Sequence, residues 1–432
     1  MSRRVAPVAF PVGLTIAGSD SGGGAGIQAD LKTMEAHAVF GTSAITAVTA
    51  QNTRGVHSSH VLPTREIEAQ IDAVLSDFEV GAVKTGMLAT VDVIETVADA
   101  LSDRDLPTVV DPVMVAATGD RLLEPEAEDA YEALLAETTL VTPNTDEAAV
   151  LTGIEPVDEE SAIEAGDALC EMGADAALVK GGHMPTEDVL DVLVTEGAIG
   201  TYRHARIETE ATHGSGCTLS AAIAARLARG ESLSESVSSA LAFMERAVRY
   251  PVDVGSGPGP VHHLVELRDR AERATTAETV SWLVDRFLDL DRTRLASEGG
   301  VVGATPYAET VSDTAGATLA RDGSETGGRA VQYGLACHTV DHLLLAREGE
   351  TTVRFAATVA RDERVEDRLQ SLDGAVVNLA DPRRPPRDAF DSAAVALAVY
   401  DRSESGEPTA TVLAPDAETL VERVGIVLDA RR

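Results

Sequence analysis

The sequence predicts an α/β fold in which helices cover both faces of a mostly parallel sheet, followed by a smaller α/β domain. Short apolar runs alternate with amphipathic stretches of helical periodicity from residue 11 to about residue 250. This order of strand and then helix is typical of parallel sheets that are buried on both faces. From about residue 300 strands and helices mix in shorter segments, which indicates a second domain.

The elements of the first domain follow from its hydrophobic periodicity. Buried strands are predicted over 12–18, 44–50, 81–86, 107–113, 138–144 and 175–182. Helices are predicted over 26–38, 64–78 and 218–230. On the second of these helices, the apolar residues that share one face are Ile67, Ile71, Val74 and Leu75. Residues 187–209 alternate in polarity and turn at Gly197 and Gly200, which is typical of a β-hairpin.

The segment 250–263 is rich in proline and glycine, which predicts the end of the first domain. We therefore expect a first domain over residues 1–265 and a second over 266–432. A helical pattern over 264–294 opens the second domain. Its further strands and helices are predicted within 328–348, 352–360, 375–381, 394–402 and 409–430.

The composition limits the classes of partner. The formal net charge of −36 is spread along the chain and repels nucleic acid and anionic membranes. Lysine occurs only as Lys32, Lys84 and Lys180. A surface rich in acidic residues and poor in lysine is typical of proteins from a salty cytoplasm, where screening relieves the self-repulsion. The three lysines are therefore expected to have local roles.

The cysteines and the apolar runs indicate a compartment. Three cysteines lie far apart with no CxxC pair, which favours a reducing environment over a disulfide or zinc framework. We find no cleavable leader and no apolar run of membrane-spanning length. We therefore expect a cytoplasmic protein.

A glycine-rich turn, "THGSGC" over 212–217, precedes the helix predicted over 218–230. Free backbone N–H groups and the helix dipole favour anion binding at such an N-terminus. A thiol placed there forms a thiolate more easily. The turn predicts an anion cradle that contains Cys217 as an acid–base residue, and the alternative is a tight turn with a buried cysteine.

Six further polar motifs each follow a predicted strand: "AGSDSGGGAG", "TAQNTRG", "KTGM", "DPVM", "TPNTDEA" and "KGGH". Ligands of open α/β sheets bind at the carboxyl ends of the strands, so these motifs are expected to meet at one edge of the sheet. The first motif lacks the GxGxxG spacing of a dinucleotide-binding turn.

Together, these ordered motifs of residues 10–265 closely resemble the hydroxymethylpyrimidine (phosphate) kinases of thiamine biosynthesis, members of the ribokinase-like superfamily. The resemblance implies a ribokinase-like three-layer α/β/α domain. It implies two ATP-dependent phosphorylations of 4-amino-5-hydroxymethyl-2-methylpyrimidine, first to the monophosphate and then to the diphosphate. It also implies ATP and Mg²⁺ as cofactors, and a homodimer.

The resemblance assigns roles around the glycine-rich turn. The N–H groups of Gly214, Ser215, Gly216 and Cys217 would hold the migrating phosphoryl group. Cys217 would accept the proton of the substrate, at a position where many members of the superfamily have an aspartate. The helix N-terminus is expected to lower the pKa of its thiol. Lys180 would contact the nucleotide phosphates.

The nucleotide side of the site involves four more residues. Asn144 and Glu147 resemble the Mg²⁺–phosphate residues of the family, and their spacing of three places both on one helix face. Asp111 would either join them at the metal or hold the end of a strand. Thr212 is expected to line the nucleotide site.

The pyrimidine needs a flat slot with a few hydrogen bonds. The resemblance places Gln51 and Met87 against the substrate, with the Gln51 amide paired to the ring and Met87 over its face. Gly18 would let the backbone approach closely, and Asp30 lies on the next helix. Lys84 would either serve the site or hold its loop.

Residues from about 275 to 432 resemble, more weakly, the archaeal-type thiamine-phosphate synthase domain. The histidine of that family corresponds to His338 in "YGLACHTVDHLLLA". Its arginine falls within "DTAGATLARDG", where Ala317 stands near the expected position and Arg321 follows. A metal site shared by His338 and His342, one turn on, is a less favoured alternative.

Two functions are open for this second domain. One is an enzyme that joins the pyrimidine diphosphate to the thiazole phosphate, and the other is a non-catalytic domain that binds thiamine phosphate. Displacement of Arg321 from the expected position favours binding slightly, since the diphosphate leaving group needs a cation.

For the whole chain, the alternatives are a pyridoxal-type kinase of the same superfamily and an inactive kinase that serves as a sensor. Gln51 favours the pyrimidine over pyridoxal. Intact Lys180, Glu147 and Cys217 argue against an inactive kinase.

Overall fold

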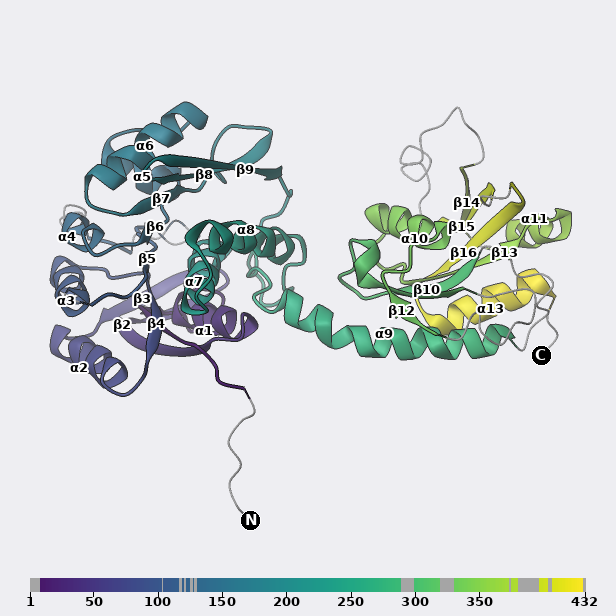
Figure 1. Ribbon diagram of the computed structural model, residues 1–432, viewed down its shortest axis with the longest axis horizontal. Coiled ribbons are helices and arrows are strands. Elements are labelled where there is room, and N and C mark those ends of the chain that lie inside the picture. Colours follow the sequence, from purple (N-terminus) through teal and green to yellow (C-terminus); the bar gives the residue numbers. More distant parts are fainter. Residues whose placement is uncertain are drawn as a thin grey trace, which may run out of the picture. The chain divides into compact units, whose positions relative to one another are not determined.

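The computed structural model describes residues 8–102, 104–115, 119, 122–124, 127, 130–288, 299–318, 330–372, 374–379, 396–402 and 406–429. The chain divides into two compact units, of which the first ends at Val265 and the second begins at Glu266. Each unit consists of a sheet with helices packed on it (Figure 1).

The N-terminal unit is built on one large sheet. Its strands are β1 (Val12–Ser19), β2 (Phe40–Asn52), β3 (Gly55–Val61), β4 (Val80–Thr85), β5 (Thr108–Val110), β6 (Leu140–Val141), β7 (Ala176–Val179), β8 (Asp188–Thr195) and β9 (Ala198–Ala205). Among the described residues, these nine strands lie in the order β3-β2-β1-β4-β5-β6-β7-β8-β9. The six strands from β2 to β7 in this order are mutually parallel, and β3, β8 and β9 pair antiparallel at the edges. The predicted mostly parallel sheet is confirmed.

Helices cover both faces of this sheet. They are α1 (Gly26–Ala36), α2 (Thr64–Leu75), α3 (Val91–Leu101), α4 (Tyr131–Leu135), α5 (Thr145–Thr152), α6 (Glu159–Glu171), α7 (Ser215–Ala228) and α8 (Leu233–Arg249). In Figure 1, α2, α3 and α4 lie on one face, and α1, α7 and α8 lie on the other. On α2, Ile67 and Ile71 are fully buried as predicted, and each such burial contributes about 1.5–3 kcal/mol.

One strand of this sheet has no counterpart in the sequence prediction. The prediction places a single strand over 44–50, whereas β2 begins at Phe40 and turns directly into β3. Most side chains of β3, "GVHSSHV", are exposed at the sheet edge, so the strand lacks the apolar pattern on which the prediction depends. The predicted hairpin over 187–209 is confirmed by β8 and β9, and the chain turns at Gly197 as predicted. The predicted turn at Gly200 is wrong, because Gly200 lies within β9 and pairs with Leu193.

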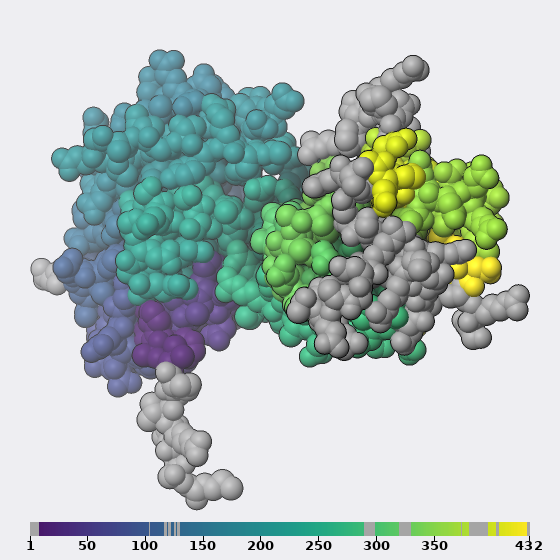
Figure 2. Space-filling model, turned by 45° about the vertical axis from the view of Figure 1, so that its right-hand side comes forward, coloured from purple at the N-terminus to yellow at the C-terminus, as the bar shows by residue number. Residues whose placement is uncertain are grey.

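Helices α1 and α7 are far apart in the sequence but pack side by side. Figure 1 shows the contact between the two ribbons, and Figure 2 shows the purple and teal surfaces adjoining. Both helices begin directly after a glycine-rich turn, and the two turns touch at Gly24 and Gly214. This packing brings two helix N-termini to the same edge of the sheet.

The C-terminal unit contains β10 (Gly300–Ala304), β11 (Thr314–Thr318), β12 (Gln332–Tyr333), β13 (Phe355–Ala360), β14 (Ala375–Asn378), β15 (Ala396–Arg402) and β16 (Pro408–Ala414). Its described strands form one sheet in the order β12-β11-β10-β13-β16-β15-β14, in which only the β14–β15 pair is parallel. Its helices are α9 (Val265–Leu288), α10 (His338–Gly349), α11 (Glu363–Gln370) and α13 (Ala417–Leu428), with a short 3-10 turn η3 (Val311–Asp313). The predicted smaller α/β domain is confirmed. No helix in the described ranges combines the length and apolarity that a bilayer crossing requires.

A buried arginine holds together one end of the C-terminal unit. Arg347 on α10 is almost fully buried. Its guanidinium donates hydrogen bonds of 2.7–3.2 Å to the carbonyl oxygens of Pro306, Ala308, Thr351 and Val353. The Arg347 guanidinium therefore supplies hydrogen-bond donors to backbone carbonyl groups in two loops, 306–308 and 351–353.

Replacing this residue, Arg347→Leu, should lower the free energy of unfolding of the C-terminal unit by about 3 kcal/mol, because several buried carbonyl groups lose their donor. Urea unfolding followed by the fluorescence of Trp282, the single tryptophan of the chain and a residue of α9, measures this loss. Arg364→Leu, at an exposed position on α11, is the matched control. Equal urea midpoints for Arg347→Leu and the unchanged protein would contradict the assignment.

Candidate active site

The glycine-rich turn over 212–217 leads into α7 as predicted. Gly214 is the N-cap, with φ +79°, and a Cβ there would collide with the carbonyl oxygen of Gly24, so only glycine fits. The Ser215 N–H donates to the Thr212 carbonyl at 3.1 Å. The N–H groups of Gly216 and Cys217 make no hydrogen bond within the part of the chain that the structure describes. Of the four N–H groups predicted to hold the phosphoryl group, that of Ser215 is thus engaged within the turn, and those of Gly216 and Cys217 are available to an anion.

Lys180 and two carboxylates lie beside this helix start. The Lys180 Nζ is 3.0 Å from Asp111 Oδ1 and 4.0 Å from Glu147 Oε2. A Cβ added to Gly216 would lie 3.3 Å from the same Nζ and 3.5 Å from Asp111 Oδ2. The residues come from the ends of β5 and β7 and from α5, and they form one cluster at the start of α7.

Glu147 has a double role in this cluster. Its carboxylate accepts the backbone N–H of Asn144, and the Asn144 side chain accepts the N–H of Glu147, both at 2.8 Å. Burial raises the pKa of Glu147 to about 7, with Asp111 acting in the same direction and Lys180 opposing. The predicted Asn144–Glu147 pair is therefore a capping box that also carries a carboxyl group into the site.

The donor set fits Mg²⁺ only with help from the nucleotide. In the described ranges, no three His, Cys, Asp or Glu side chains are grouped closely enough to hold a metal ion on their own. Mg²⁺ commonly takes one or two carboxylates and completes its shell with water and phosphate oxygens. Asp111 and Glu147 supply two carboxylates on the phosphate side, so the residues fit such an ion.

The thiol of Cys217 lies where α1 and α7 meet. The N–H of Gly26, the first residue of α1, lies near it and acts to lower its pKa. Burial raises the pKa of the Cys217 thiol to about 11; Lys84 opposes this shift, while Asp30 and Asp111 reinforce it. The expected lowering is therefore wrong for the protein without ligands, because desolvation and two carboxylates outweigh the helix N-terminus.

Asp30 and Lys84 form a buried ion pair beneath the site. The Lys84 Nζ lies 3.0 Å from both Asp30 oxygens, and Thr15 Oγ1 donates to Asp30 Oδ2 at 2.6 Å. Both side chains are completely buried. Lys84 therefore supports the site from below, and a direct contact between Asp30 and the substrate stays a prediction.

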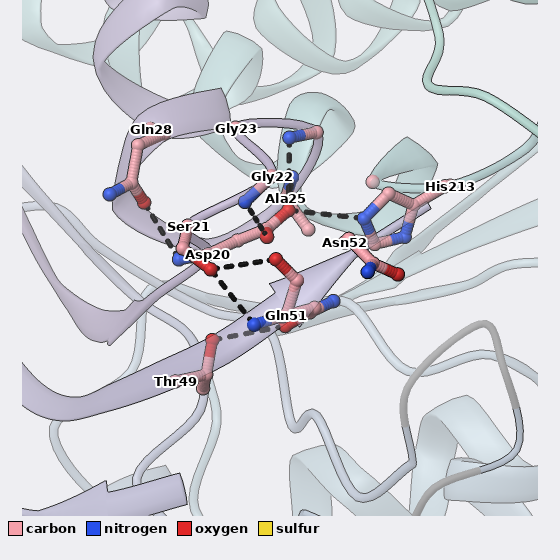
Figure 3. Close-up of polar contacts among 12 residues, drawn as sticks. Asp20, Ser21, Gly22, Gly23, Ala25, Gln28, Thr49, Gln51, Asn52 and His213 are labelled. Atoms are coloured by element: carbon pink, nitrogen blue, oxygen red, sulfur yellow. Dashed lines mark hydrogen bonds and ion pairs between the residues drawn. The ribbon is translucent and has the colours of Figure 1, made fainter. Parts of the chain in front are cut away.

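The predicted pyrimidine residues lie at adjacent strand ends. A Cβ on Gly18 would sit 3.0 Å from the Sδ of the buried Met87, so this glycine lets the two segments approach. Gln51 accepts a hydrogen bond from Thr49 at its Oε1, and its backbone N–H donates to Ser21 Oγ at 2.8 Å (Figure 3). Thr212 is exposed at the start of the glycine-rich turn.

Sequence reasoning missed Asp20 and His213. The Asp20 carboxylate accepts the N–H groups of Gly22, Gly24 and Ala25 at 2.7–2.9 Å, and His213 Nε2 lies 3.1 Å from its Oδ2 (Figure 3). The sequence could have indicated both residues as candidates, since each stands next to a glycine-rich turn. What the sequence does not give is that the two turns meet.

In the C-terminal unit, His338 is the first residue of α10, and its ring lies edge-on to that of His342 with 5.6 Å between centroids. The two ring nitrogens of His342 contact Thr411 Oγ1 at 2.8 Å and Asp401 Oδ2 at 3.0 Å. Both are thereby engaged, which argues against a metal shared with His338. Arg321 lies outside the described residues.

The start of α7 brings free backbone N–H groups together with a lysine, two carboxylates and a thiol at the carboxyl edge of a parallel sheet. This arrangement is that of a kinase of the ribokinase-like class. A model of the phosphomethylpyrimidine kinase family matches residues 20–262, which is more than half of the chain. The chain belongs to the phosphomethylpyrimidine kinase family. Residues 294–425 match the family described as thiamine-phosphate synthase ThiN, which confirms the resemblance of the second domain.

Individual relatives agree with this assignment. The hydroxymethylpyrimidine/phosphomethylpyrimidine kinase of Haemophilus influenzae is 48% identical over 256 residues, which are 58% of this chain and 95% of the relative. The phosphomethylpyrimidine kinase structure from Clostridium difficile is 38% identical, with a TM-score of 0.50 over 55% of this chain and 99% of its own. An ADP complex of Bacillus subtilis pyridoxal kinase is 36% identical, with a TM-score of 0.56 over 60% of this chain and 99% of its own.

Replacing Lys84 by methionine should lower the free energy of unfolding of the N-terminal unit by about 3–5 kcal/mol, because it leaves the Asp30 carboxylate buried and unpaired. Equilibrium unfolding in urea followed by circular dichroism measures this loss. The double variant Lys84→Met/Asp30→Leu should recover most of it, since neither charge of the pair then remains buried. A double variant no more stable than Lys84→Met would contradict the buried ion pair.

Proposed function

We propose that residues of the N-terminal unit transfer the γ-phosphoryl group of ATP to the hydroxymethyl oxygen of 4-amino-5-hydroxymethyl-2-methylpyrimidine, and then to the phosphate of the monophosphate formed. This unit is a hydroxymethylpyrimidine/phosphomethylpyrimidine kinase domain of thiamine biosynthesis. The residue roles rest on one observation. The N–H groups of Gly216 and Cys217, the Lys180 ammonium and the Cys217 thiol lie together at the start of α7.

The nucleotide binds on the Lys180 side. The Gly216 and Cys217 N–H groups and the positive end of the α7 dipole stabilise the charge on the transferring group. Lys180 neutralises phosphate charge from a second direction, where Asp111 and Glu147 now hold its ammonium. These two carboxylates would hold Mg²⁺, which neutralises phosphate charge when it is bound.

The pyrimidine binds on the side of Gly18, Gln51 and Met87, so that its hydroxymethyl group faces Cys217. As the hydroxymethyl oxygen bonds to the γ-phosphorus, its proton passes to the thiolate of Cys217. The bond from that phosphorus to the bridging oxygen breaks, and ADP leaves. In the second phosphorylation the nucleophile is already an anionic phosphate oxygen, so that step needs no base.

Cys217→Ala should lower kcat for phosphorylation of the alcohol by about 10²–10⁴-fold, the range of general-base catalysis. It should lower kcat for phosphorylation of the monophosphate by less than about tenfold, since the nucleophile of that step carries no proton. For the unchanged protein, kcat/KM for the alcohol should rise with pH above neutrality, because a base with a pKa of about 11 is mostly protonated there. Separate steady-state assays with each acceptor measure these effects.

Cys217→Asp is the matched variant, because it puts a carboxylate base at the same position. It should retain part of the activity with the alcohol and lose the alkaline rise, since a carboxylate is already ionised at neutral pH. An alkaline rise that persists in Cys217→Asp, or equal losses in the two steps for Cys217→Ala, would contradict the role of the thiol.

Phosphorylation of pyridoxal is a second candidate activity, favoured by the similarity to the solved pyridoxal kinases. The Gln51 amide, with a donor and an acceptor, matches an aminopyrimidine edge better than a hydroxyl-bearing pyridine. We therefore expect a higher kcat/KM for the pyrimidine alcohol than for pyridoxal when the two compete in one assay.

We further propose that the C-terminal unit, a ThiN domain, is an active synthase. The bond between the pyrimidine methylene carbon and the diphosphate oxygen breaks, the thiazole nitrogen bonds to that carbon, and diphosphate leaves. His338 at the N-terminus of α10 and the cation of Arg321 would contact the diphosphate. The alternative is binding of thiamine phosphate without catalysis.

The full chain should form thiamine phosphate from the pyrimidine diphosphate and thiazole phosphate, and His338→Ala should reduce the rate by at least about tenfold, because the leaving group loses a donor. Chromatography of the products in high-salt buffer measures this rate, with Arg364→Leu as the control. Tight binding of thiamine phosphate without any product from the unchanged protein would instead support the non-catalytic alternative. The homodimer and the adaptation to high salt stay predictions.

A further inference from the structure

We propose that Asp20 and His213 form a positioning pair that fixes the start of α1 against the start of α7 and so sets the distance between the acceptor and the phosphoryl group. The proposal rests on the kinase function proposed above. Among the described residues, no hydrogen bond or ion pair joins Asp20 or His213 to Lys180, Asp111, Glu147 or the Cys217 thiol. Their effect on the reaction would pass through the two glycine-rich turns.

Asp20 organises the turn before α1. Its buried carboxylate accepts three backbone N–H groups, from Gly22, Gly24 and Ala25. Burial alone would raise the pKa of Asp20, but the hydrogen bonds from His213 and from this turn outweigh it and hold the pKa below its ordinary value. The carboxylate is therefore ionised at neutral pH, and each hydrogen bond to it is charge-assisted.

His213 carries the link to the second turn. Its Nε2 donates to Asp20 Oδ2 at 3.1 Å, and the next residue is Gly214, the N-cap of α7. The backbones beside this bond are in direct contact, since a Cβ on Gly214 would collide with the Gly24 carbonyl oxygen, and a Cβ on Gly24 would lie 2.5 Å from the His213 ring. The Asp20–His213 hydrogen bond therefore spans the junction of two turns that approach too closely for a Cβ at Gly24 or Gly214.

The segment after α8 closes over the same junction. The Val261 N–H donates to the His213 carbonyl, and His263 Nε2 donates to the Gly24 carbonyl, each at 3.2 Å. Burial lowers the pKa of His263 to about 4, reinforced by Lys32, so this ring is neutral near pH 7. The two turns are thus held from outside as well as through Asp20 and His213.

Both turns end at the reacting groups, which makes this junction relevant to catalysis. Gly26, at the end of the first turn, lies close enough to the Cys217 thiol for its N–H to act on the pKa of that thiol. Gly214, at the end of the second, begins the helix whose Gly216 and Cys217 N–H groups face the phosphate. A shift of about 1 Å between acceptor and phosphoryl group can cost about 10²-fold in rate. Loss of the Asp20–His213 bond should therefore slow the chemical step more than it weakens nucleotide binding.

Two amide variants test this pair. In His213→Gln the side-chain nitrogen can occupy the position of His213 Nε2 and still reach Asp20, whereas in His213→Asn it is one carbon too short. We expect kcat for the alcohol to fall by about 30–100-fold in His213→Asn and to stay within about fivefold in His213→Gln, with KM for ATP changed by less than about threefold in both. Asp20→Asn/His213→Asn should be no slower than the slower single variant, because the residues act as a unit.

A second readout does not depend on turnover. In a Cys170→Ser/Cys337→Ser background, the rate at which iodoacetamide alkylates Cys217 at a fixed pH reports on the surroundings of the thiol. This rate should change by at least about threefold in His213→Asn and should match the parent protein in His213→Gln. His60→Gln, at an exposed position on β3, is the control and should change neither readout.

The outcomes separate this proposal from the kinase function. If the parent protein transfers no phosphate, the kinase assignment fails, and the alkylation rates alone decide whether the pair positions Cys217. Equal impairment of His213→Gln and His213→Asn, or parental values for His213→Asn in both readouts, would overturn the positioning role. A loss of kcat restored by glutamine but not by asparagine would support it.

Discussion

The site depends on close contact between two helix N-termini around one thiol. The turns before α1 and α7 meet at Gly24 and Gly214, where no Cβ fits, and Cys217 lies at the junction. Because both helices direct N–H groups to this point, negative charge is favoured there. The thiol is only partly exposed there and lies near Asp30 and Asp111, which is why its pKa rises rather than falls. The architecture thus provides an anion site together with a base that is weakly ionised at neutral pH.

All three lysines of this acidic chain make contacts around the starts of α1 and α7. Lys84 neutralises Asp30 beneath the site, Lys180 lies between Asp111 and Glu147, and Lys32 donates to the Gly23 carbonyl at 2.6 Å. A buried carboxylate without a partner is costly, so the removal of Lys84 or Lys180 would destabilise the surroundings of Asp30 or of Asp111 and Glu147. The expectation that the lysines have local roles is confirmed by these contacts.

The sequence predicted most of the fold because buried strands and amphipathic helices have periodic patterns of apolar residues. Strand β3 was not predicted, because an exposed edge strand has no such pattern. It also predicted the cluster of Lys180, Glu147 and Cys217, since motifs that follow parallel strands meet at one edge. It gave the wrong direction for the pKa of Cys217, because the burial of the thiol and the nearness of Asp30 and Asp111 are tertiary properties. Asp20 and His213 were missed for the same reason, since their pairing joins turns far apart in the chain.

The most direct test of the central claim is a crystal structure of the full chain with the pyrimidine alcohol and a non-hydrolysable ATP analogue. We expect the hydroxymethyl oxygen within hydrogen-bond distance of Cys217 Sγ, with the terminal phosphate on the N–H groups of Gly216 and Cys217 and within reach of Lys180. A hydroxymethyl group directed away from the sulfur, or a terminal phosphate bound elsewhere than at the start of α7, would contradict it.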